Sequence, residues 1–213
     1  MSKSNEVYEL VIERLVSAHY AFGDRLLVKE LGAETGASRQ PIMSALNRLS
    51  AEGFVHIVPQ VGCEVINPSP EDIGDFFQLF QRLEGLLGEL AAKRRTGDDL
   101  IELKLAHQRL AMMEAASDAS PSRYLALNQA FHRQLHLMAH SPILARKQKN
   151  NFNMIDFFIG QSLGFGHLMT GGTTVDEHEQ IVDAIEKQDA KRAGAESEAH
   201  ITAIAEAVLA SFN

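Results

Sequence analysis

The stretch from Val28 to Ile66 reads VKELGAETGASRQPIMSALNRLSAEGFVHIVPQVGCEVI, and it contains the strongest structural pattern in the chain. Its second predicted helix carries four apolar residues at the i, i+3, i+4, i+7 spacing of one helix face: Ile42, Ala45, Leu46 and Leu49. The opposite face is polar, and no acidic residue occurs between Glu34 and Glu52. A helix of this kind can lie in the major groove of DNA, although an ordinary helical hairpin explains the two helices equally well.

A β-hairpin pattern follows the two helices. Residues Phe54–Val58 are β-branched or aromatic apart from one histidine, Pro59–Gly62 supply a turn, and Cys63–Ile66 return as a second strand. A helix-turn-helix followed by a hairpin is the winged-helix arrangement, in which the wing reaches toward the DNA backbone or the minor groove. The hairpin therefore favours a DNA-binding domain over a plain helical hairpin.

Two segments of this stretch, Leu31–Pro41 and Ala45–Val55, carry a family resemblance. With the upstream turn Phe22–Leu26, they resemble the DNA-binding domain of GntR-family bacterial transcription regulators. In that family the turn begins with proline, where this chain has Phe22. The resemblance covers about the first third of the chain and implies binding to double-stranded operator DNA.

The residues expected to contact DNA lie on the recognition helix, just before it and on the wing: Arg25, Lys29, Ser38, Arg39, Gln40, Met43, Ser44, Asn47, Arg48 and Gly62. Most relatives carry arginine where this chain has Met43 and Val61. Arginine reads guanine because its fork matches the O6 and N7 acceptors, and methionine cannot make that contact. We therefore expect an operator that differs from the usual one, or weaker binding.

Charge and cysteine content limit the remaining possibilities. The net charge of −8 argues against a protein that coats nucleic acid through bulk charge, and residues 1–68 hold six Lys/Arg against eight Asp/Glu. Phosphate contacts then require a local basic patch, which a homodimer presents twice. Such contacts make the predicted DNA binding sensitive to salt.

The single cysteine, Cys63, excludes a disulfide framework and a cysteine metal site and is expected to be packed. The absence of a signal-like or membrane-spanning apolar run predicts a cytoplasmic protein without membrane association.

The second part of the chain is predicted to be helical throughout. Two prolines within Asn67–Pro70 place the boundary between domains at 1–68 and 69–213, and Ser-Pro helix starts occur at Ser69, Ser120 and Ser141. Thr174 begins a capping-box pattern, and Gly171-Gly172 marks a break. Helices are expected near 70–95, 98–118, 121–140, 142–166, 175–187 and 189–212, and the core of the first is expected to contain Phe76, Phe77, Leu79, Phe80, Leu83 and Leu87. The predicted fold is mainly α, with an N-terminal winged helix-turn-helix that includes a small β-hairpin and a C-terminal antiparallel all-α helical bundle.

Seven of the nine histidines lie in this predicted bundle. His132 follows Asn128 by four residues on one predicted helix, so the two side chains share a face, and His178 and His200 lie on two later helices. Three inward imidazoles and one oxygen ligand suit zinc, nickel or a similar divalent ion. The alternative is that these histidines lie on helix surfaces and have no special role. His136 and His140 are expected to be surface or core residues without a special role.

The bundle resembles the FCD effector domain of the FadR subfamily. The resemblance rests on Asn128–His132, Glu177–Ile185 and Glu198–Ile201. It implies a divalent metal held by Asn128, His132, His178 and His200. It also implies a small organic acid as effector, bound by these four residues and by Phe80. Relatives carry aspartate at the position of Asn128, and the neutral asparagine predicts a weaker or empty metal site. Relatives often carry arginine at the position of Phe80, which favours a more apolar acid here, with simple core packing of Phe80 as the alternative.

Two other classes of protein fit the sequence less well. A metal-binding helical-bundle enzyme of the di-iron type needs Glu-x-x-His, which is absent, and the zinc protease motif fails because Val182 follows His178-Glu179 where a second histidine is required. A protein-interaction module is disfavoured by the wing and the acid-free recognition face. The sequence therefore predicts a ligand-controlled repressor or activator, in which a dimer places two recognition helices on half-sites about one DNA turn apart.

Overall fold

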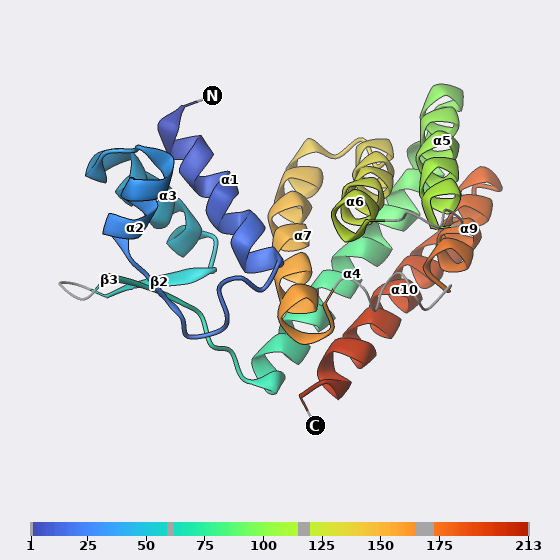
Figure 1. Ribbon diagram of the computed structural model, residues 1–213. Helices are drawn as coiled ribbons and strands as arrows, with labels where there is room; N and C mark the ends of the chain where they lie inside the picture. Colours follow the sequence, from blue (N-terminus) through green and yellow to red (C-terminus); the bar gives the residue numbers. More distant parts are fainter. Residues whose placement is uncertain (1, 59–61, 115–119, 165–172, 213) are drawn as a thin grey trace. The chain divides into compact units, whose positions relative to one another are not determined.

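The computed structural model describes residues 2–58, 62–114, 120–164 and 173–212 (Figure 1). The chain divides into two compact units: Met1–Ser69 with Asp156–Gln161, and Pro70–Ile155 with Ser162–Asn213. The first contains a winged helix-turn-helix with a small antiparallel sheet, and the second is a helical bundle. The predicted fold class is therefore confirmed. Within the described part of the chain, no helix is long and apolar enough to cross a membrane.

The first unit contains the predicted helices and hairpin together with two elements that were not predicted. Its elements are α1 (Lys3–Val16), β1 (Arg25–Leu26), α2 (Val28–Thr35), α3 (Arg39–Ala51), β2 (Val55–Val58) and β3 (Gly62–Val65). The additional elements are α1 and β1, and β1 completes a three-stranded antiparallel sheet in the order β1-β3-β2. Gly36 ends α2 in the left-handed conformation, with φ +65°, which permits the sharp turn into α3.

The apolar face predicted for α3 is the core of this unit. Ile42, Ala45, Leu46 and Leu49 are each at most 1% exposed. Helix α1 adds Val7, Val11 and Leu15, all fully buried, to the same core. Cys63 is buried in β3, as expected, and burial raises the pKa of its thiol to about 11. This thiol therefore remains protonated and unreactive at neutral pH.

The second unit consists of six helices in the described part of the chain. They are α4 (Pro70–Arg94), α5 (Gly97–Glu114), α6 (Pro121–Met138), α7 (Pro142–Ser162), α9 (Thr173–Glu186) and α10 (Ala190–Ala210), of which α7 is shared with the first unit. Three of them begin at the prolines of the predicted Ser-Pro starts, and Ser120 caps α6 by accepting a hydrogen bond from Arg123 N. Helix α9 begins at Thr173, so Thr174 lies inside its first turn and is not the cap. The predicted break at Gly171-Gly172 and the predicted helix end near residue 118 fall outside the described residues.

Helix α4 buries one stripe of side chains in the bundle. Ile73, Phe77, Phe80 and Leu87 are at most 1% exposed. The assignment of Leu79 to the core was wrong, since this residue is 62% exposed. At 100° per residue, Leu79 points about 160° away from Phe77 and 100° away from Phe80, so it cannot join the same stripe.

Helices α4 and α10 run side by side in opposite directions and approach closely (Figure 1). The close approach depends on glycine, because a Cβ at Gly88 would lie 2.5 Å from Ser197 Oγ and 2.8 Å from the backbone oxygen of Ala193. A Cβ at Gly194 would lie 2.7 Å from Glu89 Cγ. This contact fixes the position of α10, and with it the position of His200.

Candidate metal site and DNA-binding surface

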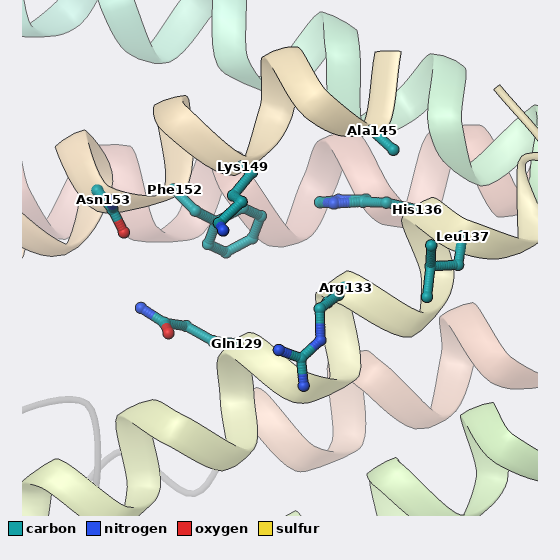
Figure 2. Close-up of a pocket in the computed structure, with 8 residues that line it drawn as sticks. All are labelled: Gln129, Arg133, His136, Leu137, Ala145, Lys149, Phe152 and Asn153. Carbon is teal, nitrogen blue, oxygen red and sulfur yellow. The ribbon is translucent and has the colours of Figure 1, made fainter. Parts of the chain in front are cut away.

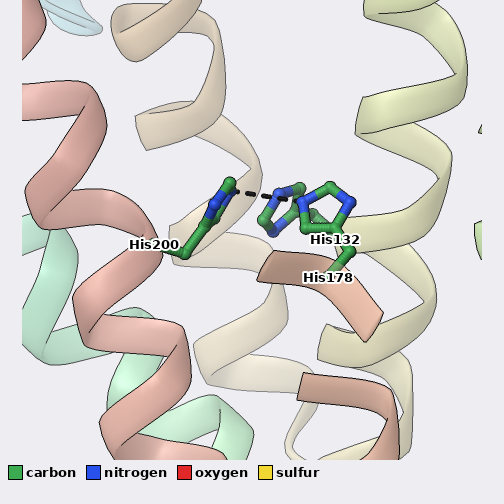
Figure 3. Close-up of side chains that lie close together, drawn as sticks. All are labelled: His132, His178 and His200. Carbon is green, nitrogen blue, oxygen red and sulfur yellow. Dashed lines mark hydrogen bonds between the residues drawn. The ribbon is translucent and has the colours of Figure 1, made fainter. Parts of the chain in front are cut away.

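Three histidines from three helices meet inside the bundle. His132 of α6, His178 of α9 and His200 of α10 are each at most 2% exposed. One ring nitrogen from each lies within 4.8 Å of the others, and Nε2 of His178 is 3.2 Å from Nε2 of His200 (Figure 3). The structure thus brings together the three histidines that the sequence singled out.

A carboxylate stands behind two of these histidines. Nδ1 of His132 lies 3.2 Å from Glu84 Oε2, and Nδ1 of His200 lies 2.7 Å from Glu177 Oε2. An imidazole that donates Nδ1–H to a carboxylate keeps its lone pair on Nε2 and is held in one orientation. Both rings therefore present an Nε2 lone pair, as metal-ligating histidines do.

Glu84 is the centre of a buried network. Besides His132, its carboxylate accepts hydrogen bonds from His136 Nε2 at 2.6 Å and from Gln148 Nε2 at 2.5 Å, and all of these side chains are buried. Burial alone would raise the pKa of Glu84, but His136 and His132 outweigh it and hold this pKa well below the usual range. Glu84 is therefore a carboxylate anion, stabilised by three donors.

Two of the three clustered histidines, His132 and His178, are neutral at physiological pH. Burial is the largest influence on both His132 and His178: it lowers the pKa of His132 to about 4, against the opposing effect of Glu84, and lowers the pKa of His178 well below its usual value. A metal binds only the neutral imidazole, so protons do not compete with a metal for the rings of His132 and His178 near neutral pH.

Asn128 is the candidate for the oxygen ligand that such a site requires. It lies one turn before His132 on α6, and its Oδ1 atom is buried without a hydrogen-bond partner among the described residues. Nδ1 of His178 is likewise buried and unpartnered in the described part of the chain. A buried carbonyl oxygen without a partner is costly unless it binds something, and a divalent ion is a suitable partner. The donor set therefore fits a metal with three nitrogens and one neutral oxygen.

The sequence did not predict the carboxylates and amide that support the histidines: Glu84, Glu177 and Gln148. One signal was available, because Glu84 is the single acid on the buried stripe that contains Phe77, Phe80 and Leu87. His136 was expected to have no special role, whereas it is buried and bonded to Glu84. His140 is exposed and pairs with Asp99 at 3.0 Å.

Phe80 lies in the aromatic core and is linked to the histidines through Phe152. It is fully buried, and its ring contacts Phe152 with 5.2 Å between centroids. Phe152 in turn lies 4.8 Å from the ring of His132. The Phe152 ring therefore borders the histidine cluster, and Phe80 packs against that ring.

The predicted DNA-contacting residues of α3 and its surroundings lie at the surface. The exposed ones are Arg25, Lys29, Ser38, Arg39, Gln40, Ser44 and Asn47, and Met43 is half-buried. Ser38 is the N-cap residue of α3, but its side chain makes no capping hydrogen bond, which leaves an open helix N-terminus of the kind that binds phosphate. Gly62 pairs with Val58 in the wing, and Val61 lies outside the described residues.

Arg48 has partners within the described part of the first unit. Its guanidinium lies 3.5 Å from the centre of the Tyr8 ring, and its Nε donates to Glu52 at 3.0 Å. Tyr8 Oη donates to the same carboxylate at 2.6 Å. Arg48 is exposed but held in place by α1, so any phosphate contact would be made by a preoriented side chain.

Comparisons with known proteins agree with both units. Residues 3–65 match the family of bacterial regulatory proteins called the gntR family, and residues 75–203 match the FCD domain. The HTH-type transcriptional repressor RspR of Escherichia coli is 24% identical over 207 residues, which span 96% of this chain and 88% of RspR. A probable D-xylose utilization operon transcriptional repressor of Paenarthrobacter nicotinovorans is 23% identical over 87% of this chain and 80% of its own length.

Solved structures share the fold over the whole chain. E. coli McbR/YncC has a TM-score of 0.81 at 18% identity, and a GntR regulator from Rhodococcus sp. RHA1 has a TM-score of 0.78 at 18% identity. Each of these two alignments covers 100% of both chains. From these matches, the chain belongs to the GntR family of DNA-binding transcription regulators, in the FadR-like subfamily with a C-terminal FCD domain, and is not an enzyme.

Proposed function

We propose that this regulator is a cytoplasmic homodimer that represses transcription from a palindromic operator and releases it in response to a small organic acid. Repression is supported by the two relatives described as repressors. The effector is proposed to bind beside a divalent metal in the FCD domain. The observation that carries this proposal is the buried group of His132, His178 and His200, two of them oriented by carboxylates.

Operator recognition would rest on the exposed face of α3. Arg39 and Gln40 at its first turn, with Ser44 and Asn47 further along, supply hydrogen-bonding groups without an acidic neighbour on the helix. Met43 contributes apolar contact, which suits a thymine methyl group better than the guanine that arginine reads. Lys29 and the open N-terminus of α3 are proposed to position the domain on the phosphates.

The metal would be held by His132, His178, His200 and the Oδ1 atom of Asn128. Zinc or nickel fits three imidazoles and one oxygen, and the bound ion would supply a positive charge that coordinates an effector carboxylate. Because Asn128 brings no charge, we expect weaker metal binding than in relatives with aspartate. Phe152 borders the site with an apolar ring and Phe80 packs against that ring, so an acid with an apolar body is the proposed effector.

The effector would act by favouring one arrangement of the dimer over another. It can shift DNA affinity only by the ratio of its affinities for the two arrangements, typically about 5–150-fold. Fluorescence titration of a labelled palindromic fragment from the gene's own upstream region tests DNA binding. We expect salt-dependent binding that Arg39→Ala weakens. Lys191→Ala, on the exposed surface of α10, should leave the binding unchanged. Failure to bind at any salt concentration would contradict the operator assignment.

The metal assignment has its own test. Freshly purified protein is compared by elemental analysis with a His132→Ala/His178→Ala/His200→Ala variant whose helicity is checked by circular dichroism. We expect close to one divalent ion per chain after zinc loading in the natural protein and none in the variant. Equal metal content in the two proteins would refute the site.

A further inference from the structure

A pocket lies between α6 and α7, and the proposed ligands of the metal are not among the residues that line it. Its volume is about 260 Å³, the space of about nine water molecules at about 30 Å³ each. Arg133 of α6 and Lys149 of α7 both line the pocket, and Figure 2 shows the Lys149 side chain pointing from α7 toward α6. A pocket of this size can hold a small organic molecule.

The surroundings of this pocket are positive in a negative protein. The net charge of the chain is −8, yet the sequence from Ala119 to Ile155 contains five arginines and lysines and no acidic residue. Arg133 and Lys149 form no ion pair with a described residue, in contrast to Arg82, which pairs with Glu198. Two cations that share a concave surface without a carboxylate partner attract anions.

The other walls favour an organic anion over an inorganic one. Phe152 and Leu137 form apolar surface, while Gln129 and Asn153 place amide groups at the pocket. Phe152 is buried and supplies a flat aromatic wall, and the amides can donate to or accept from a polar substituent. The combination of two cations with an aromatic wall matches a carboxylate carried on a ring or a short apolar chain.

The pocket is separate from the metal site but adjoins it. The ring of Phe152 lies 4.8 Å from the His132 ring and 5.4 Å from the His136 ring, so it stands between the two places. His136 lines the pocket and also bonds to Glu84, which bonds to His132. The residues that line the pocket include no carboxylate, and Glu84 behind His136 accepts hydrogen bonds from three donors within the network.

We propose that the pocket between α6 and α7 is a metal-independent binding site for a small organic carboxylate, with Arg133 and Lys149 as its charge partners. This site goes beyond the metal-centred effector site proposed above and does not require that site to be loaded. The guanidinium of Arg133 can bind the carboxylate through two N–H groups, and the ammonium of Lys149 adds a third donor. The ring or chain of the ligand packs on Phe152.

The test uses the full-length protein and para-fluorobenzoate as the probe, followed by fluorine NMR. We expect saturable binding of the same strength, within about twofold, in zinc-loaded protein and in protein stripped with EDTA. The neutral para-fluorobenzamide, which has nearly the same shape, is expected to bind at least about tenfold more weakly because it cannot pair with the two cations.

Two double variants complete the test. Arg133→Ala/Lys149→Ala should raise the dissociation constant of the probe at least about tenfold. Arg146→Ala/Lys147→Ala removes the same charge from exposed residues of α7 that do not line the pocket. This variant should change the dissociation constant of the probe less than about twofold. The proposal is overturned if the probe does not bind saturably, if binding disappears with the metal, or if the two double variants weaken binding equally. Loss of zinc binding alone would count against the metal site and leave this pocket standing.

Discussion

Replacing Glu84 by glutamine should weaken zinc binding while preserving the fold. Glu84 is the carboxylate behind His132, and it accepts three hydrogen bonds, from His132 at 3.2 Å, His136 at 2.6 Å and Gln148 at 2.5 Å. Glutamine has nearly the same shape but only one acceptor oxygen, and its amide nitrogen would face at least one of these donors. The Nδ1–H of His132 then loses a charged acceptor, and the ring loses both basicity and a fixed orientation.

The magnitude follows from the burial of the network. Loss of an acceptor behind a ligating histidine typically costs about 10–100-fold in metal affinity, or about 1.4–2.7 kcal/mol. The Glu84 side chain is 1% exposed, so water cannot replace the lost acceptor, and we expect the upper part of this range. Glu177, behind His200, has a side chain that is 32% exposed, so water can substitute for it. Glu177→Gln should therefore cost about tenfold or less.

The assay is a competition titration of zinc against a chromophoric chelator near neutral pH, with circular dichroism as the measure of folding. Both variants should retain the helicity of the natural protein, and the zinc dissociation constant should rise most in Glu84→Gln. The reasoning would be refuted by a folded Glu84→Gln protein whose zinc affinity lies within about twofold of the natural value. A larger effect from Glu177→Gln would equally refute the argument from burial.

Three further predictions concern stability and DNA binding. The folded pKa of His132 is about 4, below its unfolded value of about 6.5, so the unfolded chain binds the extra proton between these values. The free energy of unfolding therefore decreases as pH falls below about 6.5, and this histidine accounts for a loss of about 2 kcal/mol at pH 5. Urea unfolding of metal-free protein measures it, and equal free energies of unfolding at pH 7 and pH 5 would contradict the prediction. Gly88→Ala should lower the free energy of unfolding by about 1–3 kcal/mol, because its Cβ would lie 2.8 Å from the backbone oxygen of Ala193. The control is Gly97→Ala, whose Cβ would meet nothing within 4 Å, and it should leave the free energy of unfolding unchanged. Arg39→Ala should weaken operator binding by about 1–3 kcal/mol. Titrations at several salt concentrations show which contact is lost, because loss of a base contact leaves the salt slope unchanged and loss of a phosphate contact makes it shallower.

Local patterns were sufficient for the winged helix-turn-helix and for most of the bundle. The apolar positions of α3 repeat with the period of a helix, so the face that contains Ile42 and Leu46 had to be buried in any compact fold. The Ser-Pro starts of α4, α6 and α7 act through the backbone of the same few residues and need no tertiary contact. The strand β1 was missed because its two residues acquire strand geometry only through pairing with β3.

The candidate site divides in the same way. The sequence by itself determined which histidines are able to form a metal site, because His132 shares a helix face with Asn128 and a resemblance places His178 and His200 with them. The tertiary structure alone decided what stands behind those histidines: Glu84 and Glu177 come from positions 48 and 23 residues away along the chain, and their pairing depends on how the helices pack. The same packing buries Glu84 among its donors and brings Arg133 and Lys149 to the lining of one pocket. Helical periodicity specifies the face on which a side chain lies, but burial and charge pairing depend on the neighbouring helix that faces it.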